Sequence, residues 1–191
     1  MTNYSIPAFN IFINNMRTHF AKNLPEKIQW EGVRELVKTL CANETMRNAS
    51  RSWIAKKGRE YVLHIDEEYD FFVGALVREP HHRAGIHDHG PSWTIYGVLD
   101  GVEMTHIYKS IDDPNDPHKT KLEIKNKYNA PTGHVDIVPP HVIHCEWGMS
   151  ERSVAITVRT ANPNTYDQNR FDLKTGKTWT SRGLNLVPLL V

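Results

Sequence analysis

The stretch "EYVLHIDEEYDFFVGALVREPHHRAGIHDHG" (Glu60–Gly90) contains two short apolar segments followed by a cluster of histidines. The segments Glu60–Asp66 and Asp70–Arg78 are rich in Val, Leu, Tyr and Phe, as is typical of β-strands. The chain has 11 histidines, and four of them fall within His81–Trp93. This stretch therefore predicts paired strands and offers the first candidate for a functional site.

The β pattern continues through the rest of the chain, with turn signals such as Gly-Pro, Asp-Gly, Asp-Pro and Pro-Pro between the segments. Many short strands punctuated in this way are typical of an antiparallel sandwich or barrel. We expect a polar hairpin loop at Ile111–Lys119 and a loop or short hairpin at Pro163–Lys177. The further segments expected to be strands are Trp93–Ser110, Lys119–Asn126, His134–Pro139, His141–Trp147 and Arg152–Thr160.

The first third of the chain has a different, helical pattern. Apolar residues recur through Phe9–Phe20 and again through Ile28–Asn43, with Pro25 between the two segments. In the second segment they follow the spacing of one helix face. We therefore expect residues 1–58 to form a helical region packed on a β domain of residues 59–191, the two together making one structural domain.

Composition limits the classes of function. The 191 residues include 23 Lys and Arg against 22 Asp and Glu, so the net charge of +1 favours neither nucleic acid nor an anionic membrane as a partner. We see no apolar run near 18 residues and no signal-peptide pattern. Cys41 and Cys145 alone make a poor disulfide framework. We expect a soluble, cytoplasmic protein that binds no nucleic acid and no membrane.

The histidine pattern predicts a metal site. Side chains two residues apart on a strand share a face, so His87 and His89 would converge if Ile86–Gly90 is extended. Neutral imidazoles bind iron, copper, nickel and zinc. The third ligand is expected from "VPPHVIHCEWG", where His144 follows a Pro-Pro turn, while His141 would point to the opposite face.

These residues resemble a known family. "GIHDHG" followed by "GHVDIVPPHVIH" resembles the two metal-binding motifs of the cupin superfamily, and Arg59–Lys177 is similar to its bacterial thiol dioxygenase branch, of the cysteine or 3-mercaptopropionate dioxygenase type. The resemblance implies a mostly β chain forming a cupin (double-stranded β-helix) barrel with an N-terminal helical cap. It also implies Fe(II) on His87, His89 and His144. The implied enzyme adds O2 to the sulfur of a small carboxylate-bearing thiol and releases a sulfinate.

One absence fits that branch. Most cupins place a Glu ligand about five residues after the second histidine, where this chain has Thr94. Thiol dioxygenases also lack that Glu. In animal cysteine dioxygenases a Cys at this place is crosslinked to a Tyr, and Thr94 cannot form such a bond.

The last core strand departs from the family. Its Ser-x-His-x-Tyr relay corresponds here to one face of Ser153–Arg159, which carries Ser153, Ala155, Thr157 and Arg159. Two registers are open, and in both of them the His and Tyr are replaced. Glu60 also stands near the place where the family uses Arg or Gln to bind substrate.

The candidates for substrate contacts are therefore Arg159, Thr157 and Tyr96. An inward-pointing Arg159 needs an anionic partner, which could be Glu60, a substrate carboxylate, or both. Tyr96 shares strand parity with Thr94 and could offer its hydroxyl. Two other functions remain open, namely a cupin dioxygenase or lyase acting on a non-thiol small molecule and a non-catalytic metal-binding cupin.

Overall fold

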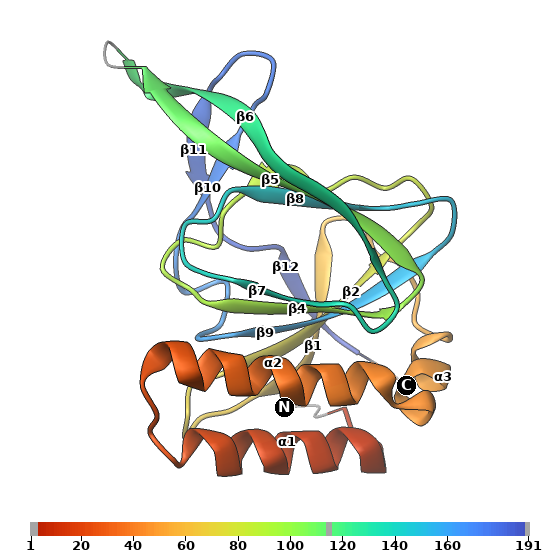
Figure 1. The fold of residues 1–191 in the computed structure, drawn as a ribbon. Helices are drawn as coiled ribbons and strands as arrows, with labels where there is room; N and C mark the ends of the chain where they lie inside the picture. The colour runs from red at the N-terminus through yellow and green to blue at the C-terminus, as the bar shows by residue number, and fades with distance from the viewer. Residues whose placement is uncertain (1–3, 114–115, 190–191) are drawn as a thin grey trace.

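The computed structural model describes residues 4–113 and 116–189, in which three helices precede a β-rich body (Figure 1). The helices are α1 (Pro7–Phe20), α2 (Glu26–Ala42) and α3 (Glu44–Ser50). The strands are β1 (Arg59–Ile65), β2 (Phe72–Arg78), β3 (Ile86–His87), β4 (Thr94–Asp100), β5 (Val102–Asp113), β6 (Asp116–Pro131), β7 (Val135–Val138), β8 (His144–Gly148), β9 (Ser153–Arg159), β10 (Gln168–Phe171), β11 (Thr178–Ser181) and β12 (Asn185–Pro188).

The strands form two six-stranded sheets, so the prediction of a mostly β chain is confirmed. The first sheet has the order β12-β1-β2-β9-β4-β7 and the second has the order β11-β10-β3-β8-β5-β6. The tail folds back as the hairpin β10–β11, in line with the expected short hairpin. The parallel pairing of β12 with β1 was not expected from the sequence.

The long hairpin β5–β6 corrects one expectation. The loop expected over Ile111–Lys119 is mostly strand, because β5 runs to Asp113 and β6 starts at Asp116. Residues 114–115 of the expected loop lie outside the described residues. This hairpin projects from the body beside β10 and β11 (Figure 1).

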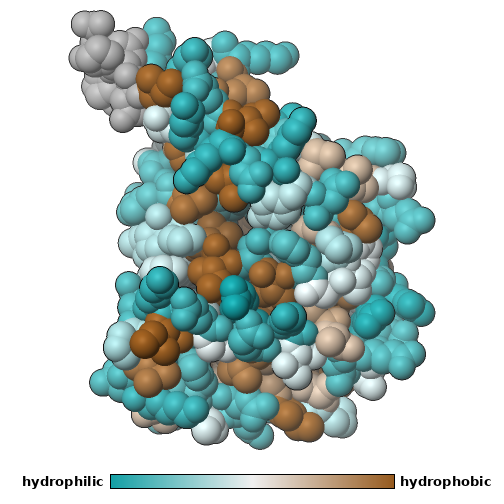
Figure 2. Space-filling view, viewed as in Figure 1, coloured by the Kyte–Doolittle hydropathy of each residue, from teal (hydrophilic) through white to brown (hydrophobic). Residues whose placement is uncertain are grey.

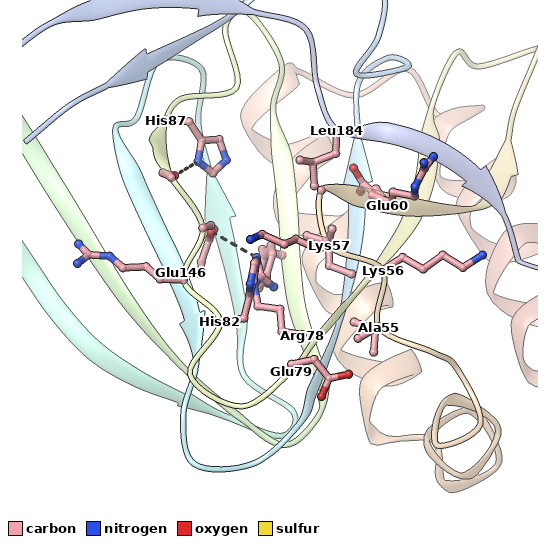
Figure 3. Close-up of a pocket in the computed structure, with 18 of the residues that line it drawn as sticks. Ala55, Lys56, Lys57, Glu60, Arg78, Glu79, His82, His87, Glu146 and Leu184 are labelled. Atoms are coloured by element: carbon pink, nitrogen blue, oxygen red, sulfur yellow. Dashed lines mark hydrogen bonds and ion pairs between the residues drawn. The ribbon is translucent and has the colours of Figure 1, made fainter.

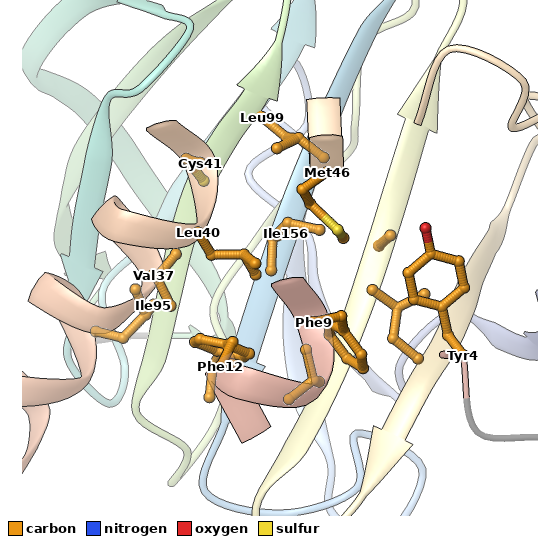
Figure 4. Packing of buried hydrophobic residues seen from close by; sticks show 14 of the residues in the cluster. Tyr4, Phe9, Phe12, Val37, Leu40, Cys41, Met46, Ile95, Leu99 and Ile156 are labelled. Carbon is orange, nitrogen blue, oxygen red and sulfur yellow. The ribbon is translucent and has the colours of Figure 1, made fainter. Parts of the chain in front are cut away.

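The main apolar core lies between the helices and the first sheet. Phe12, Val37 and Leu40 from the helices pack against Ile95 and Ile156 from the strands (Figure 4). Strand alternation explains what remains on the other face of this sheet. In β9 the side chains of Val154, Ile156 and Val158 join the helical core, so Ser153, Ala155, Thr157 and Arg159 point toward the second sheet.

The outer surface is mixed in character. Figure 2 shows mostly hydrophilic residues with apolar ones scattered over the helices and the projecting hairpin. The exposed apolar residues include Ile11 and Ile28 on the helices and Ile111 and Ile124 on the hairpin. In the described part of the chain, no helix combines the length and apolar character that a membrane span requires.

Asp66 fastens α1 to the end of β1. Its buried carboxylate accepts a 2.6 Å hydrogen bond from Nε of Arg17 and lies 3.2 Å from Nε2 of His64. It also accepts backbone N–H bonds from Glu68 and Tyr69. Burial alone would raise the pKa of Asp66, but hydrogen bonds from the Tyr69 backbone and from Arg17 bring it below the usual 3.8.

We expect Asp66→Ala to lower the free energy of unfolding by about 2–3 kcal/mol, because buried donors lose a charged acceptor. Arg17→Ala should cost less, since the Arg17 side chain is 45% exposed and water screens its charge. The contribution of Asp66 is full above pH 3.8 and is lost as the pH falls through the lower folded-state pKa. Urea unfolding at several pH values measures both effects. Equal losses in the free energy of unfolding of Asp66→Ala and Arg17→Ala would contradict the conclusion that the buried Asp66 carboxylate stabilises this contact.

Candidate metal centre

Three histidines from two strands and a turn meet between the sheets. β3 pairs antiparallel with β8, and His87 lies directly opposite His144. The ring centroids are 4.6 Å apart for His87 and His144, 4.7 Å for His89 and His144, and 5.0 Å for His87 and His89. One ring nitrogen from each residue lies within 4.8 Å of the other two. The structure thus brings together the three histidines predicted from the sequence.

His89 reaches the cluster by a different path from the one expected. The extended segment ends at His87, and the chain then turns, with Gly90 at a φ of +52°. Asp88 points away from the cluster, and its carboxylate accepts bonds from the backbone N–H groups of Gly90 and Asn169. A side chain at Gly90 would come within 2.3 Å of a backbone carbonyl of the tail. The turn therefore requires glycine.

His141 stays outside the cluster, although it belongs to the same "PPHVIH" segment. It precedes β8, has a φ of +62° and carries a side chain that is 67% exposed. Its Nδ1 lies 3.8 Å from the Asp88 carboxylate, on the solvent side.

The rings of His87 and His144 are oriented in the way that metal ligands require. Nδ1 of His87 bonds to the Gly85 carbonyl at 2.9 Å, and Nδ1 of His144 bonds to the Val142 carbonyl at 2.8 Å. Such outer bonds fix the tautomer with the proton on Nδ1 and leave Nε2 as the donor atom. Nε2 of His144 is buried and has no hydrogen-bond partner with good geometry among the described residues. An ion held by the three nitrogens would satisfy it.

Burial also keeps two of the imidazoles neutral. It lowers the pKa of His87 to about 3 and that of His89 well below 6.5, helped by the neighbouring His144. Burial acts in the same direction on His144, but the Glu146 carboxylate outweighs it and raises the pKa of His144. Neutral imidazoles are the form that binds iron, nickel, copper or zinc, so the cluster fits a transition metal and does not choose among them.

Glu146 is a buried carboxylate that was not among the residues expected from the sequence. It lies two residues after His144 on β8, so both side chains share one face. Its Oε1 is 3.2 Å from Nε2 of His144, and its Oε2 is 3.7 Å from Nη2 of Arg78. Figure 3 shows Glu146 and Arg78 directed toward each other, with His87 nearby on the cavity wall. A negative charge therefore borders the histidine cluster.

The cluster opens onto a cavity of about 410 Å³ between the two sheets. Glu60, Tyr96, Arg159 and Arg170 are among its lining residues, together with His87, His89 and Glu146. The volume is in the range of small-molecule sites.

Arg159 is held by the carboxylate that sequence analysis offered as one possible partner. Its Nη1 donates to Oε1 of Glu60 at 2.5 Å and to Oγ1 of Thr157 at 3.1 Å. Thr157 also donates to Oε1 of Glu60, at 2.6 Å. Gly74 makes room for this cluster, because a Cβ there would lie 2.6 Å from the Glu60 oxygen. Nε of Arg159 is buried without a partner among the described residues, and the side chain is one of those that line the cavity.

Tyr96 lines the cavity, but its hydroxyl is engaged elsewhere. It donates to Oε2 of Glu103 at 2.7 Å and accepts a short hydrogen bond from Arg78. Ser153 also donates to Glu103, at 2.7 Å. Thr94 is buried, and its hydroxyl has no partner among the described residues. The position five residues after His89 therefore holds no charged side chain.

Comparison with known proteins gives partial structural matches only. No protein-family model matches the sequence, and no curated protein matches it. A structure of the DMSP lyases RdDddP and RnDddQII matches 53% of this chain and 44% of that chain, at 13% identity and a TM-score of 0.39. Oxalate oxidase in complex with the substrate analogue glycolate matches 49% of this chain and 44% of that chain, at 18% identity and a TM-score of 0.40. A cupin domain of Schizosaccharomyces pombe Cnp3 matches 52% of this chain and 58% of that chain, at 11% identity and a TM-score of 0.40.

Each of these matches spans less than two thirds of the other chain. A likeness of this extent indicates nothing about activity, which depends on the residues of the site.

Proposed function

We propose that this chain is a cupin-type, Fe(II)-dependent dioxygenase that adds O2 to the sulfur of a small carboxylate-bearing thiol. The observation that carries this proposal is the cluster of His87, His89 and His144, two of whose members line a cavity that is also lined by Arg159. Iron(II), when held by three imidazoles, supplies the redox chemistry that lets O2 react with a thiolate. Thr94 supports the thiol branch, because no carboxylate stands at its position.

The chain's own residues would bind and orient the substrate. Arg159 lines the cavity, where its guanidinium would bind a substrate carboxylate, while Glu60 and Thr157 hold that guanidinium in place. This anchoring would place the thiol sulfur at the histidine cluster. The reacting groups would then be held close together in a suitable orientation, which lowers the entropic part of the activation barrier. The two sheets shield the site, with His89 and His144 buried and His87 half-buried.

The reaction makes a definite prediction about stoichiometry. Two S–O bonds form, sulfur loses four electrons, and O2 gains them, so no other reductant is needed. We expect iron-loaded protein to consume one O2 per sulfinate formed, with neither hydrogen peroxide nor disulfide as the main product. An oxygen electrode combined with mass spectrometry of the products measures this. Absence of thiol-dependent O2 uptake across small mono- and dicarboxylate thiols would overturn the proposal.

Glu146 favours a second candidate, a metal-dependent dioxygenase or lyase that acts on a non-thiol molecule. A buried carboxylate 3.2 Å from a ligand nitrogen is placed to accept a proton from a substrate carbon or oxygen. For such a substrate, Glu146→Gln should lower kcat by about 10²–10⁴-fold. A thiol needs no such base, so thiol oxidation should fall less than about tenfold. Oxygen uptake and product formation are measured for the wild type and for Glu146→Gln, with a panel of thiols and a panel of diketones. The results distinguish the two candidate functions.

A further inference from the structure

The cavity wall has a surplus of positive charge. Its lining residues include seven Lys or Arg and three Glu. Two of the cations are neutralised by carboxylates, Arg159 by Glu60 and Arg78 by Glu103 and Glu146. Neither Arg83 nor Arg170 forms an ion pair with a carboxylate among the described residues. Arg83 is exposed and lies over the Trp147 ring, so water stabilises its charge.

Arg170 differs from the other cations because it is half-buried beside the metal centre. On β10 it lies directly opposite His87 of β3, and paired residues at such positions share one face of the sheet. Its polar partners are neutral: Nε donates to the Ser181 hydroxyl at 3.0 Å, and Nη2 donates to Oε1 of Gln168 at 3.1 Å. These bonds fix the side chain without cancelling its charge.

We propose that the substrate is a small dicarboxylate, with one carboxylate on Arg159 and the second on Arg170. The two arginines come from different sheets, and both line the cavity that holds the histidine cluster. The partly desolvated guanidinium of Arg170 forms no ion pair with a carboxylate among the described residues, since Asp88 and Glu146 act on it only from beyond contact distance. A second substrate carboxylate would pair with it directly. This inference names the substrate class of the proposed function and rests on it for the place of the reacting atom.

The test is ligand binding, which does not depend on turnover. Succinate and butyrate have equal chain lengths and differ by one carboxylate. Isothermal titration calorimetry is performed on the protein as purified and on the same protein after metal removal. We expect succinate to bind about tenfold to a hundredfold more tightly than butyrate in both forms, which corresponds to one charge-assisted contact of about 1.5–3 kcal/mol.

Arg170→Gln should reduce succinate affinity to that of butyrate and leave butyrate affinity unchanged. Arg182→Gln is the matched control, because Arg182 is an exposed arginine of the same tail, paired with Asp167. Circular dichroism verifies that each variant is folded, and Arg170→Lys should recover part of the preference. Equal affinities for succinate and butyrate in the wild type, or an unchanged preference in Arg170→Gln and Arg170→Lys, would overturn the inference. Failure of the dioxygenase proposal would instead appear as missing oxygen uptake, with the succinate preference intact.

Discussion

Replacing His87 by alanine is expected to abolish metal binding while leaving the fold intact. His87 contributes one of three nitrogens that lie within 4.8 Å of one another, and its Nδ1 bond to Gly85 aims the ring at the other two. Residues that merely orient ligands contribute about 10–100-fold to metal affinity, so loss of a ligand should cost more than about 100-fold. Metal analysis after iron loading and desalting measures this directly.

His141→Ala is the matched control, because this exposed histidine belongs to the segment that supplies His144. It should retain the metal content of the wild type. Thermal unfolding gives a second readout: metal at about 100 times its Kd stabilises a folded protein by about 2.7 kcal/mol, and only wild type and His141→Ala should show this gain. Full iron occupancy in His87→Ala would refute the proposed ligand set.

The histidines could be recognised from sequence because their signal is local. His87 and His89 are two residues apart, and His144 follows a Pro-Pro turn inside a β-rich segment. Their meeting depends on β3 pairing with β8. The Pro-Pro turn and the β context made His144 a candidate, and the resemblance to cupin motifs supported it, whereas periodicity alone does not specify which strands pair. The turn at Gly90 was not expected, since an alternation rule assumes that the strand continues.

The charged residues of the site were harder to foresee. Glu146 had a usable signal, because it shares strand parity with His144. Arg170 had none, since its place beside His87 follows from a tail hairpin pairing with β3. Glu103 lies on β5 and reaches Tyr96 and Ser153 only when the two sheets face each other. Burial of a charge depends on tertiary partners, which composition and spacing do not encode.

Arg159 should discriminate between substrates with and without a carboxylate. A guanidinium binds a carboxylate through parallel charge-assisted hydrogen bonds, and the ammonium of lysine cannot reproduce that fork. Arg159→Lys should therefore raise KM with a smaller effect on kcat, because contact with a remote group is mostly uniform binding. Removal of the guanidinium in Arg159→Ala should lower kcat/KM for the carboxylate thiol by an amount equivalent to about 2–5 kcal/mol of transition-state stabilisation.

Because Arg159 is paired with Glu60, the choice of variants must account for the charge that remains when Arg159 is removed. Arg159→Ala alone leaves a buried carboxylate without its cation, which typically costs about 3–5 kcal/mol of stability. Glu60→Gln combined with Arg159→Ala removes both charges and limits that loss. The double variant should keep its metal content, because neither side chain belongs to the three-histidine set.

The decisive comparison pairs the carboxylate thiol with its amide analogue. Wild-type protein should prefer the carboxylate, since Arg159 lines the cavity and its guanidinium can pair with a carboxylate but not with an amide. In Arg159→Lys and in the double variant, kcat/KM should fall for the carboxylate and change little for the amide. Equal losses on both substrates would show that Arg159 and Glu60 only support the fold of β9 and β1. The substrate carboxylate would then be held by another cation of the cavity, and Arg170 is the half-buried one beside His87.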